Sequence, residues 1–234
     1  MKARHFFSSL ILVLVLGVVS PVLAAFPNAS VYVVHGINGT DLGLGKSLPV
    51  DVFVNGAATP VKAFTFGSIA GPLDLPSGKY EIEVRLSDPS LSSIVAISTR
   101  VDLAVGENAS IVAHLTEEGV PKLTKFVNDV RSTETSGDAR LVVRHGAAAP
   151  SVNVYLRNSA GLYLDSPLSN LRNADQMGAE VKAGNFDAYE IRSFISLAGP
   201  ISLALDASTA YFAYAVGSLR NSTFEVVVQA IHLQ

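Results

Sequence analysis

The sequence predicts an all-β protein, built as two tandem immunoglobulin-like antiparallel β-sandwich domains that follow a signal peptide. Three observations indicate this: apolar residues recur with a period of two, turn-forming residues interrupt these runs at short intervals, and the chain resembles itself. Strands that begin about every 8 to 12 residues and are separated by such turns are typical of antiparallel sandwiches. No segment with a long helical period competes with them.

The first 25 residues are predicted to be a signal peptide. Lys2 and Arg4 precede a short apolar run over residues 10–19, and small residues follow at Ala24 and Ala25. A membrane-anchoring helix is the alternative, but such a helix needs roughly 20 apolar residues. We therefore expect cleavage after one of the two alanines, no membrane span in the mature chain, and export to the periplasm, the cell surface or the medium.

Composition limits the function further. Of 234 residues, 49% are hydrophobic and 16% are charged, which indicates a folded chain rather than a disordered one. The net charge of −3, without a basic tail, argues against a nucleic-acid partner. The absence of cysteine excludes disulfides, cysteine-based zinc sites and thiol catalysis. We expect a stability that comes from core burial alone, and no cofactor.

The first sandwich is predicted over residues 26–130. Its clearest strand covers residues 80–85, where apolar and charged residues alternate, so that one face meets a core and the other meets water. The Asn-Gly pair at residues 55–56 and the Pro-Ser-Gly run at residues 76–78 predict turns on either side of neighbouring strands.

The second sandwich is predicted over residues 139–234, after a polar linker at residues 131–138. The prediction rests on internal similarity, because three segments recur in the same order with small changes in spacing. Residues 31–36 match residues 141–146, residues 50–55 match residues 152–157, and residues 77–81 match residues 183–187.

Four segments of the first half carry a family resemblance. They are a strand that ends in Val34-His35, a Val-Asp-Val-Phe-Val-Asn-Gly strand and turn at residues 50–56, a Phe-Gly pair at residues 66–67, and a Pro-Ser-Gly-Lys-Tyr turn at residues 76–80. Together they resemble the exported bacterial family called domain of unknown function 4397. The loop after His35 is longer and richer in glycine than that family's pattern, and the second half has no Phe-Gly pair. The resemblance implies tandem β-sandwiches at a bacterial envelope, and it implies no reaction.

The glycine-rich loop at residues 36–46 is the first candidate binding segment, because loops on rigid scaffolds often carry recognition. Its polar side chains Asn38, Asp41 and Lys46 are candidate binding residues. The loop ends in Gly-Lys-Ser, but its glycine spacing differs from that of a phosphate-binding loop, and a strand is expected after it instead of a helix. We interpret it as a flexible surface loop.

A second candidate surface lies on two matching strands. Asp51 and Asn153 occupy equivalent positions, beside the aromatic residues Phe53 and Tyr155. Such a mixed polar and aromatic face could bind a partner, or a neighbouring loop could cover it.

The histidines leave two alternatives open. His35 and His145 each stand at a strand end before glycine, where an imidazole either bonds a loop carbonyl and fixes the turn or contributes to a binding site. His114 is expected to be a half-exposed packing residue, with Tyr214 in the equivalent place. The alternative is a copper or zinc site formed from His35, His114, His145 and His232, since imidazole suits both metals.

The function that these features favour is that of a non-catalytic exported protein of the cell envelope or cell surface. It would bind or scaffold an envelope polymer or a surface protein, and two linked modules would raise avidity. The alternative is an envelope protein that binds copper or zinc through its histidines and could take part in redox chemistry. An enzyme that acts on polysaccharide is a third hypothesis, supported only by scattered carboxylates.

Overall fold

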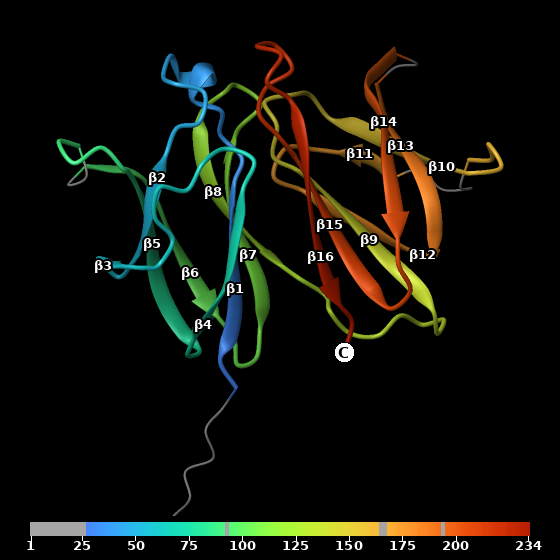
Figure 1. Cartoon of the computed structure of the whole chain (residues 1–234), viewed down its shortest axis with the longest axis horizontal. Helices are drawn as coiled ribbons and strands as arrows, with labels where there is room; N and C mark the ends of the chain where they lie inside the picture. Colours follow the sequence, from blue (N-terminus) through green and yellow to red (C-terminus); the bar gives the residue numbers. More distant parts are fainter. Residues whose placement is uncertain (1–26, 92–93, 164–167, 193–194) are drawn as a thin grey trace, which may run out of the picture.

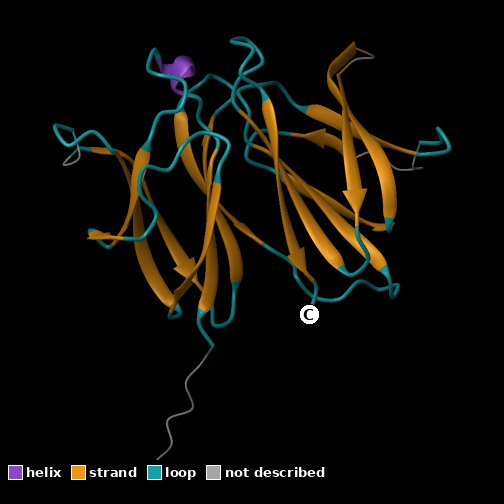
Figure 2. Ribbon diagram, in the orientation of Figure 1, coloured by secondary structure: helices purple, strands orange, loops and turns teal. Residues whose placement is uncertain are grey.

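A computed structural model describes residues 27–91, 94–163, 168–192 and 195–234. The predicted signal peptide therefore lies outside the described residues. The described part is built from strands, together with one short 3-10 helix, and these strands form two halves that lie side by side (Figures 1 and 2). No helix in the described ranges is long and apolar enough to cross a membrane.

The first half is a sandwich of two four-stranded sheets, in the orders β4-β1-β7-β8 and β3-β2-β5-β6. Its strands are β1 (Ala29–His35), β2 (Val50–Val54), β3 (Ala57–Ala58), β4 (Ile69–Leu75), β5 (Gly78–Leu86), β6 (Val95–Leu103), β7 (Asn108–Leu115) and β8 (Pro121–Val127), and the helix η1 (Gly39–Leu42) follows β1.

The second half repeats this arrangement strand for strand, in the orders β12-β9-β15-β16 and β11-β10-β13-β14. Its strands are β9 (Asp138–His145), β10 (Val152–Asn158), β11 (Leu168–Leu171), β12 (Gln176–Lys182), β13 (Gly184–Arg192), β14 (Ile195–Leu205), β15 (Thr209–Val216) and β16 (Glu225–His232). The predicted fold class, a pair of β-sandwiches, is confirmed.

One strand pair in each sandwich departs from the predicted antiparallel pattern. β1 pairs with β7 in parallel, and β9 pairs with β15 in parallel. The strands of each pair are far apart in sequence, and the chain visits the facing sheet between them. Such a long crossover lets both strands run in the same direction, which a short hairpin does not allow.

Each sandwich has its own apolar core. In the first, Val31, Val52, Ile82 and Ile111 are among the buried side chains between the two sheets. In the second, Leu141 and Val154 lie in the equivalent space. Alternation along each strand puts these residues on the inner face, so burial of this face supplies the main stabilisation of each half.

A third core lies between the two sandwiches. In Figure 1 the sheet that contains β1 and β7 faces the sheet that contains β9 and β15. Side chains on the outward faces of both sheets are buried against one another there. They include Val34, Val112, Phe126, Phe212, Tyr214 and Val216. The two sandwiches are thus packed face to face, with apolar surface removed from water on both.

The predicted linker at residues 131–138 is tied to its surroundings by hydrogen bonds. The Arg140 guanidinium donates to the carbonyl oxygen of Arg131 at 2.7 Å and to that of Asp129 at 3.0 Å. The backbone N–H of Glu134 donates to the Glu180 carboxylate at 2.8 Å. The exact division into residues 26–130, 131–138 and 139–234 remains a prediction.

Candidate functional site

Loops from both sandwiches meet around a cleft at the end of the molecule that is uppermost in Figure 1. The cleft has a volume of about 330 Å³. Its walls come from the loop after β1, the β7–β8 turn, the β9–β10 loop and the β15–β16 loop. The residues that line it are Asp41, Leu115, residues 117–119, residues 148–150 and residues 218–221.

The glycine-rich loop lies at the surface over most of residues 40–47, as predicted, and it contains the short helix η1. The Asn38 side chain accepts hydrogen bonds from the Thr40 backbone N–H at 3.1 Å and from the Thr40 hydroxyl at 2.8 Å, and so it caps η1. Gly39 packs so tightly that a Cβ there would lie 1.8 Å from the Gly45 carbonyl oxygen. The sequence predicts that Asn38 is a binding residue, but it is only 2% exposed because its side chain caps the helix. A partner therefore cannot reach it in this structure.

Asp41 clamps this loop to the other sandwich. Its carboxylate accepts hydrogen bonds from the Thr223 hydroxyl at 2.8 Å and from the Asn221 side-chain amide at 2.9 Å. Both donors belong to the β15–β16 loop. Of the three polar residues predicted in the glycine-rich loop, only Asp41 lines the cleft; Lys46 is exposed outside it.

The rim of the cleft is mainly acidic. Glu117 and Glu118 are exposed on the β7–β8 turn, and Asp41 lies on the loop opposite, whereas Arg220 is the one basic residue in the lining. A hydrogen bond from the Thr116 side chain lowers the pKa of Glu118, so this carboxyl is charged at neutral pH. The local charge therefore favours a cationic group over an anionic one.

Two buried histidines fix the loops that form the cleft. Nε2 of His35 lies 2.9 Å from the Leu48 carbonyl oxygen, and Nε2 of His145 lies 2.9 Å from that of Pro150. A carbonyl oxygen only accepts, so in each case Nε2 carries the proton and donates. Burial lowers the pKa of both imidazoles and keeps them neutral. These contacts are the loop-fixing hydrogen bonds that the sequence pattern suggests for the two residues.

The expectation for His114 is wrong. It is fully buried between the sandwiches, with Nδ1 3.0 Å from the Leu115 carbonyl oxygen and Nε2 2.8 Å from the Thr124 hydroxyl. The error arose because the outward face of β7 meets the second sandwich and not water. The expected equivalence with Tyr214 is also wrong. Arg144 matches Val34 in the internal repeat, and Tyr214 pairs with Arg144 as Val112 pairs with Val34, so Tyr214 corresponds to Val112 and not to His114.

The structure does not bring the four histidines of the alternative metal site together. His35 and His145 lie in different sandwiches, His114 lies between them, and His232 is exposed near the end of β16. Within the described ranges, no group of three or more histidine, cysteine or acidic residues is placed so that it could hold a metal ion.

Asp51 and Asn153 fasten neighbouring segments. Asp51 accepts from the Ala63 N–H at 2.8 Å and from the Ser87 hydroxyl at 2.6 Å, and this hydroxyl is the main reason that its pKa is lowered. Asn153 accepts from the Asn170 N–H at 2.7 Å. The equivalent positions thus play equivalent structural roles on β2 and β10.

The aromatic neighbours of this pair also have partners. The Arg85 guanidinium lies 4.2 Å from the centre of the Phe53 ring, and the Tyr155 and Tyr163 rings meet edge to face at 6.3 Å. Phe53 and Tyr155 are half-buried on the sheets that face away from the third core, and neither lines the cleft. The structure therefore separates the predicted binding residues into several places.

Sequence reasoning missed a buried polar cluster between the sandwiches. Arg144 is 1% exposed and donates to the Tyr214 hydroxyl at 2.8 Å, to the Gln176 amide oxygen at 3.0 Å and to the Val127 carbonyl oxygen at 3.1 Å. The Tyr214 hydroxyl in turn donates to Gln229 at 2.7 Å or to Ser110 at 2.8 Å. The signal was present in β15, which is apolar on both faces, as a strand covered on both sides should be.

Comparison with known proteins gives one family. The model of the family described as "Domain of unknown function (DUF4397)" matches residues 29–155, which run from β1 into β10. No curated protein matches.

Three solved structures show distant likenesses to this chain. A "putative cell adhesion protein" from Bacteroides ovatus has a TM-score of 0.29 and 10% identity, with 90% of this chain and 99% of that chain covered. The Bacillus anthracis TIE protein has a TM-score of 0.26 and 9% identity, with 82% and 50% covered. A "putative cell adhesion protein" from Bacteroides uniformis has a TM-score of 0.23 and 8% identity, with 92% and 100% covered. At TM-scores this low, neither fold nor function follows from these proteins.

Proposed function

The family match spans more than half of the 234 residues, so this chain belongs to the DUF4397 family, and from that premise we propose that it is a non-catalytic, exported envelope or surface protein that binds a partner through the cleft between its sandwiches. The partner is an envelope polymer or a surface protein that presents a cationic segment.

The observation that carries the proposal is the way the cleft is built. Four loops from two sandwiches converge on it, and the Asp41 carboxylate holds two of them in a fixed relation. A site whose walls are held in place loses little conformational freedom on binding, which leaves more of the contact energy for affinity.

The charge of the rim supports a cationic ligand. Glu117 and Glu118 project from the β7–β8 turn and form no ion pair within the described ranges, and the third carboxylate, Asp41, is opposite. Amino groups on a polymer, or lysine and arginine side chains on a protein, match this field.

Export is part of the same proposal. The predicted signal peptide at residues 1–25 supports it, and sequencing the amino terminus of the protein recovered from the culture medium or the envelope tests it. A mature chain that starts near Phe26 is expected; recovery of the full chain from the cytosol would contradict export.

Binding is tested with a lysine-rich peptide as the probe. The double variant Glu117→Gln/Glu118→Gln is expected to bind the peptide roughly tenfold more weakly, because two exposed charge contacts are lost. Isothermal titration at low and moderate salt measures the change. The matched control is Asp102→Asn/Glu134→Gln, which removes two exposed carboxylates outside the cleft lining. Equal weakening in both double variants would show that the peptide responds to net charge alone, and it would contradict binding at the cleft.

A further inference from the structure

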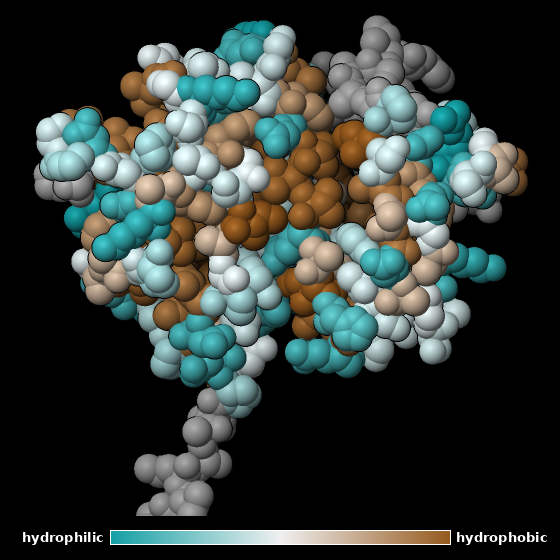
Figure 3. All heavy atoms as spheres, viewed as in Figure 1, coloured by the Kyte–Doolittle hydropathy of each residue, from teal (hydrophilic) through white to brown (hydrophobic). Residues whose placement is uncertain are grey.

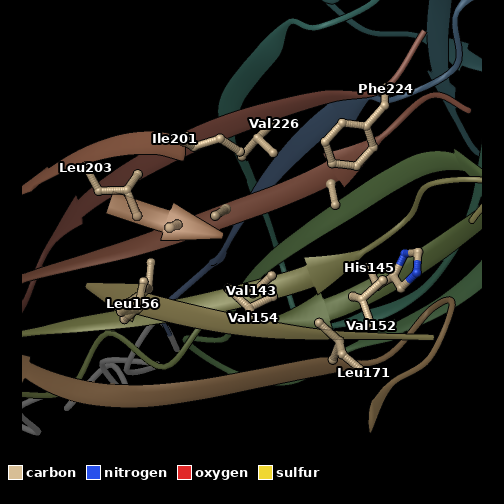
Figure 4. A pocket seen from close by; sticks show the side chains of 14 residues that line it. Val143, His145, Val152, Val154, Leu156, Leu171, Ile201, Leu203, Phe224 and Val226 are labelled. Carbon is tan, nitrogen blue, oxygen red and sulfur yellow. The ribbon is translucent and has the colours of Figure 1, made fainter. Parts of the chain in front are cut away.

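The second sandwich has an unfilled slot between its two sheets. The void has a volume of about 40 Å³ and is walled almost entirely by apolar side chains. Figure 4 shows His145 at one end of this slot and Leu156 and Leu203 toward the other. None of the residues that line the acidic cleft lines this slot, so it is a separate site.

The first sandwich shows why the slot exists. In the first sandwich, Ile111 of β7 pairs with Val33 and Lys125. The equivalent residue of β15 in the second sandwich is Ala213, which pairs with Val143 and Val228. An inward-facing isoleucine is thus replaced by alanine.

Two further differences widen the space. By the same register, Val226 of β16 stands where Leu123 of β8 stands, so another side chain is smaller. In addition, Phe64 pairs with Val50 in the first sandwich and lies beside His35, with ring centres 5.8 Å apart, whereas Leu171 pairs with Val152 in the second, so a smaller side chain stands in place of a ring. The second core lacks several carbon atoms that the first one has.

The slot is also reachable from solvent. In the first sandwich, β6 and β8 are in contact, and Lys125 ties them by donating to the Asp102 carbonyl oxygen at 2.7 Å. Its counterpart in the second sandwich is Val228, which cannot form this bond, and no comparable contact between β14 and β16 occurs in the described strands. Figure 3 shows apolar side chains gathered around a hollow in the region where Figure 1 places β16 and β14.

One polar atom in the slot wall lacks a partner. Nε2 of the fully buried His145 donates to the Pro150 carbonyl oxygen, so Nδ1 is the unprotonated nitrogen and acts as an acceptor. Among the described residues, nothing donates to it. Nδ1 of His35 in the first sandwich, by contrast, accepts from the Ile37 N–H at 3.4 Å. Buried polar atoms are normally paired, so this one points to a donor that the chain does not supply.

We propose that this slot is a binding site for a slender aliphatic alcohol, whose hydroxyl donates to Nδ1 of His145 and whose chain lies between β14 and β16. The dimensions favour an unbranched chain. One water fills roughly 10–15 Å³ of such a void, so about three heavy atoms fit fully inside the 40 Å³ slot. The remainder of the chain lies along Ile201 and Phe224, which are half-buried at the open side.

The test uses 1-heptanol and its isomer methyl hexyl ether, which has the same size and an oxygen but no donor. Methyl NMR shifts of Val143, Val152 and Val226 are followed as each probe is added to the whole protein. Saturable shifts are expected for the alcohol, with the ether about tenfold weaker or worse, because one hydrogen bond of about 1.4 kcal/mol is lost. No shift with either probe overturns the proposal, and equal affinity overturns the role of His145.

Filling the slot provides the second arm. Ala213→Ile restores the side chain that the first sandwich has, and it is expected to abolish the shifts without lowering the melting temperature. Ala230→Ile makes the same change at an exposed position of β16 and is expected to leave binding intact. If Ala213→Ile does not fold, Val226→Leu serves in its place. Binding that survives a folded filled variant, or a concentration-dependent dimer that covers the slot instead, contradicts the proposal.

Discussion

At the scale of single residues, Arg144 is the most unusual feature of the molecule. Its guanidinium is buried between the Phe126 and Phe212 rings, 4.9 and 4.5 Å from their centres, and its hydrogen bonds to Gln176, Tyr214 and Val127 all go to neutral oxygens. Burial lowers its pKa from the ordinary value, although an arginine stays charged. The two sandwiches are therefore connected here by the hydrogen bonds of the planar guanidinium group and not by an ion pair.

Arg144→Lys is expected to lower the free energy of unfolding by about 2 kcal/mol. An ammonium group stacks poorly between two rings and cannot reach three separated acceptors, so at least one of them is left unpaired. Urea denaturation measures the change. Arg131→Lys, at an exposed arginine, is the control and should have little effect. Equal stabilities for the two variants would show that the fork contributes nothing.

His114 makes stability depend on pH. Burial lowers its pKa from 6.5 to about 4, with a smaller contribution from the charge of Lys122. Between these values the unfolded chain binds the proton and the folded chain does not, so protonation favours unfolding. The contribution is complete above about pH 6.5 and is lost as the pH falls toward 4, to a total of about 3 kcal/mol.

His114→Gln is expected to flatten this acid limb in part, since His35 and His145 also have lowered pKa values and keep contributing. Melting temperatures from pH 4 to pH 7 (roughly the span that a histidine titration covers) provide the measurement. His232→Gln, at an exposed histidine, is the matched control. An unchanged slope in His114→Gln would mean that His114 is not buried in solution.

At the scale of the elements, two glycines that follow β1 and β9 allow the sheets to meet. A Cβ on Gly36 would lie 2.5 Å from Cγ1 of Val216, and a Cβ on Gly146 would lie 2.9 Å from Cβ of His114. Backbone hydrogen bonds cross the interface at the same points, from the Gly217 N–H to Gly36 at 3.1 Å and from the Leu115 N–H to Gly146 at 3.3 Å. The same device occurs once on each sandwich.

Gly36→Ala is therefore expected to destabilise the protein by about 2 kcal/mol, because the added methyl group forces β15 away from β1. Chemical denaturation checks it against Gly45→Ala, where an added Cβ would meet nothing within 4 Å. A Gly36→Ala protein as stable as Gly45→Ala would indicate that the interface yields without cost.

The elements also show what the sequence could and could not predict. Alternation and turn residues predicted the strands well, since both signals are local. Residues 50–54 lie on β2 and residues 152–157 lie on the corresponding strand β10, while Asn55 begins the predicted turn. The identity of the surface that covers an outward face is not local. For that reason His114 was assigned to a half-exposed position, and Arg144 was not recognised at all.

The candidate site followed the same rule. The sequence identified the loop after β1, and Asp41 in it, from the glycine content and polar side chains. It could not indicate that the β7–β8 turn and the β15–β16 loop meet that loop, because these segments are far apart along the chain. The sequence also could not show that the Asn38 side chain caps the helix η1.

At the scale of the whole molecule, the Asp41 clamp and the third core join two sandwiches into one body. Asp41→Ala is expected to cost about 1–2 kcal/mol, because the Thr223 hydroxyl and the Asn221 amide lose a charged partner. Hydrogen exchange should quicken at the β15–β16 loop while the core strands stay protected. Asp102→Ala, an exposed carboxylate outside the clamp, is the control. Uniform protection in both variants would show that the clamp does not hold the loop.

The fixed relation between the sandwiches is the central claim, and an electron-spin distance measurement tests it most directly. The chain has no cysteine, so Lys79→Cys and Lys182→Cys place one exposed label on each sandwich. A single narrow distance distribution is expected from the whole protein. A broad distribution, such as two modules on a free linker produce, would contradict the account.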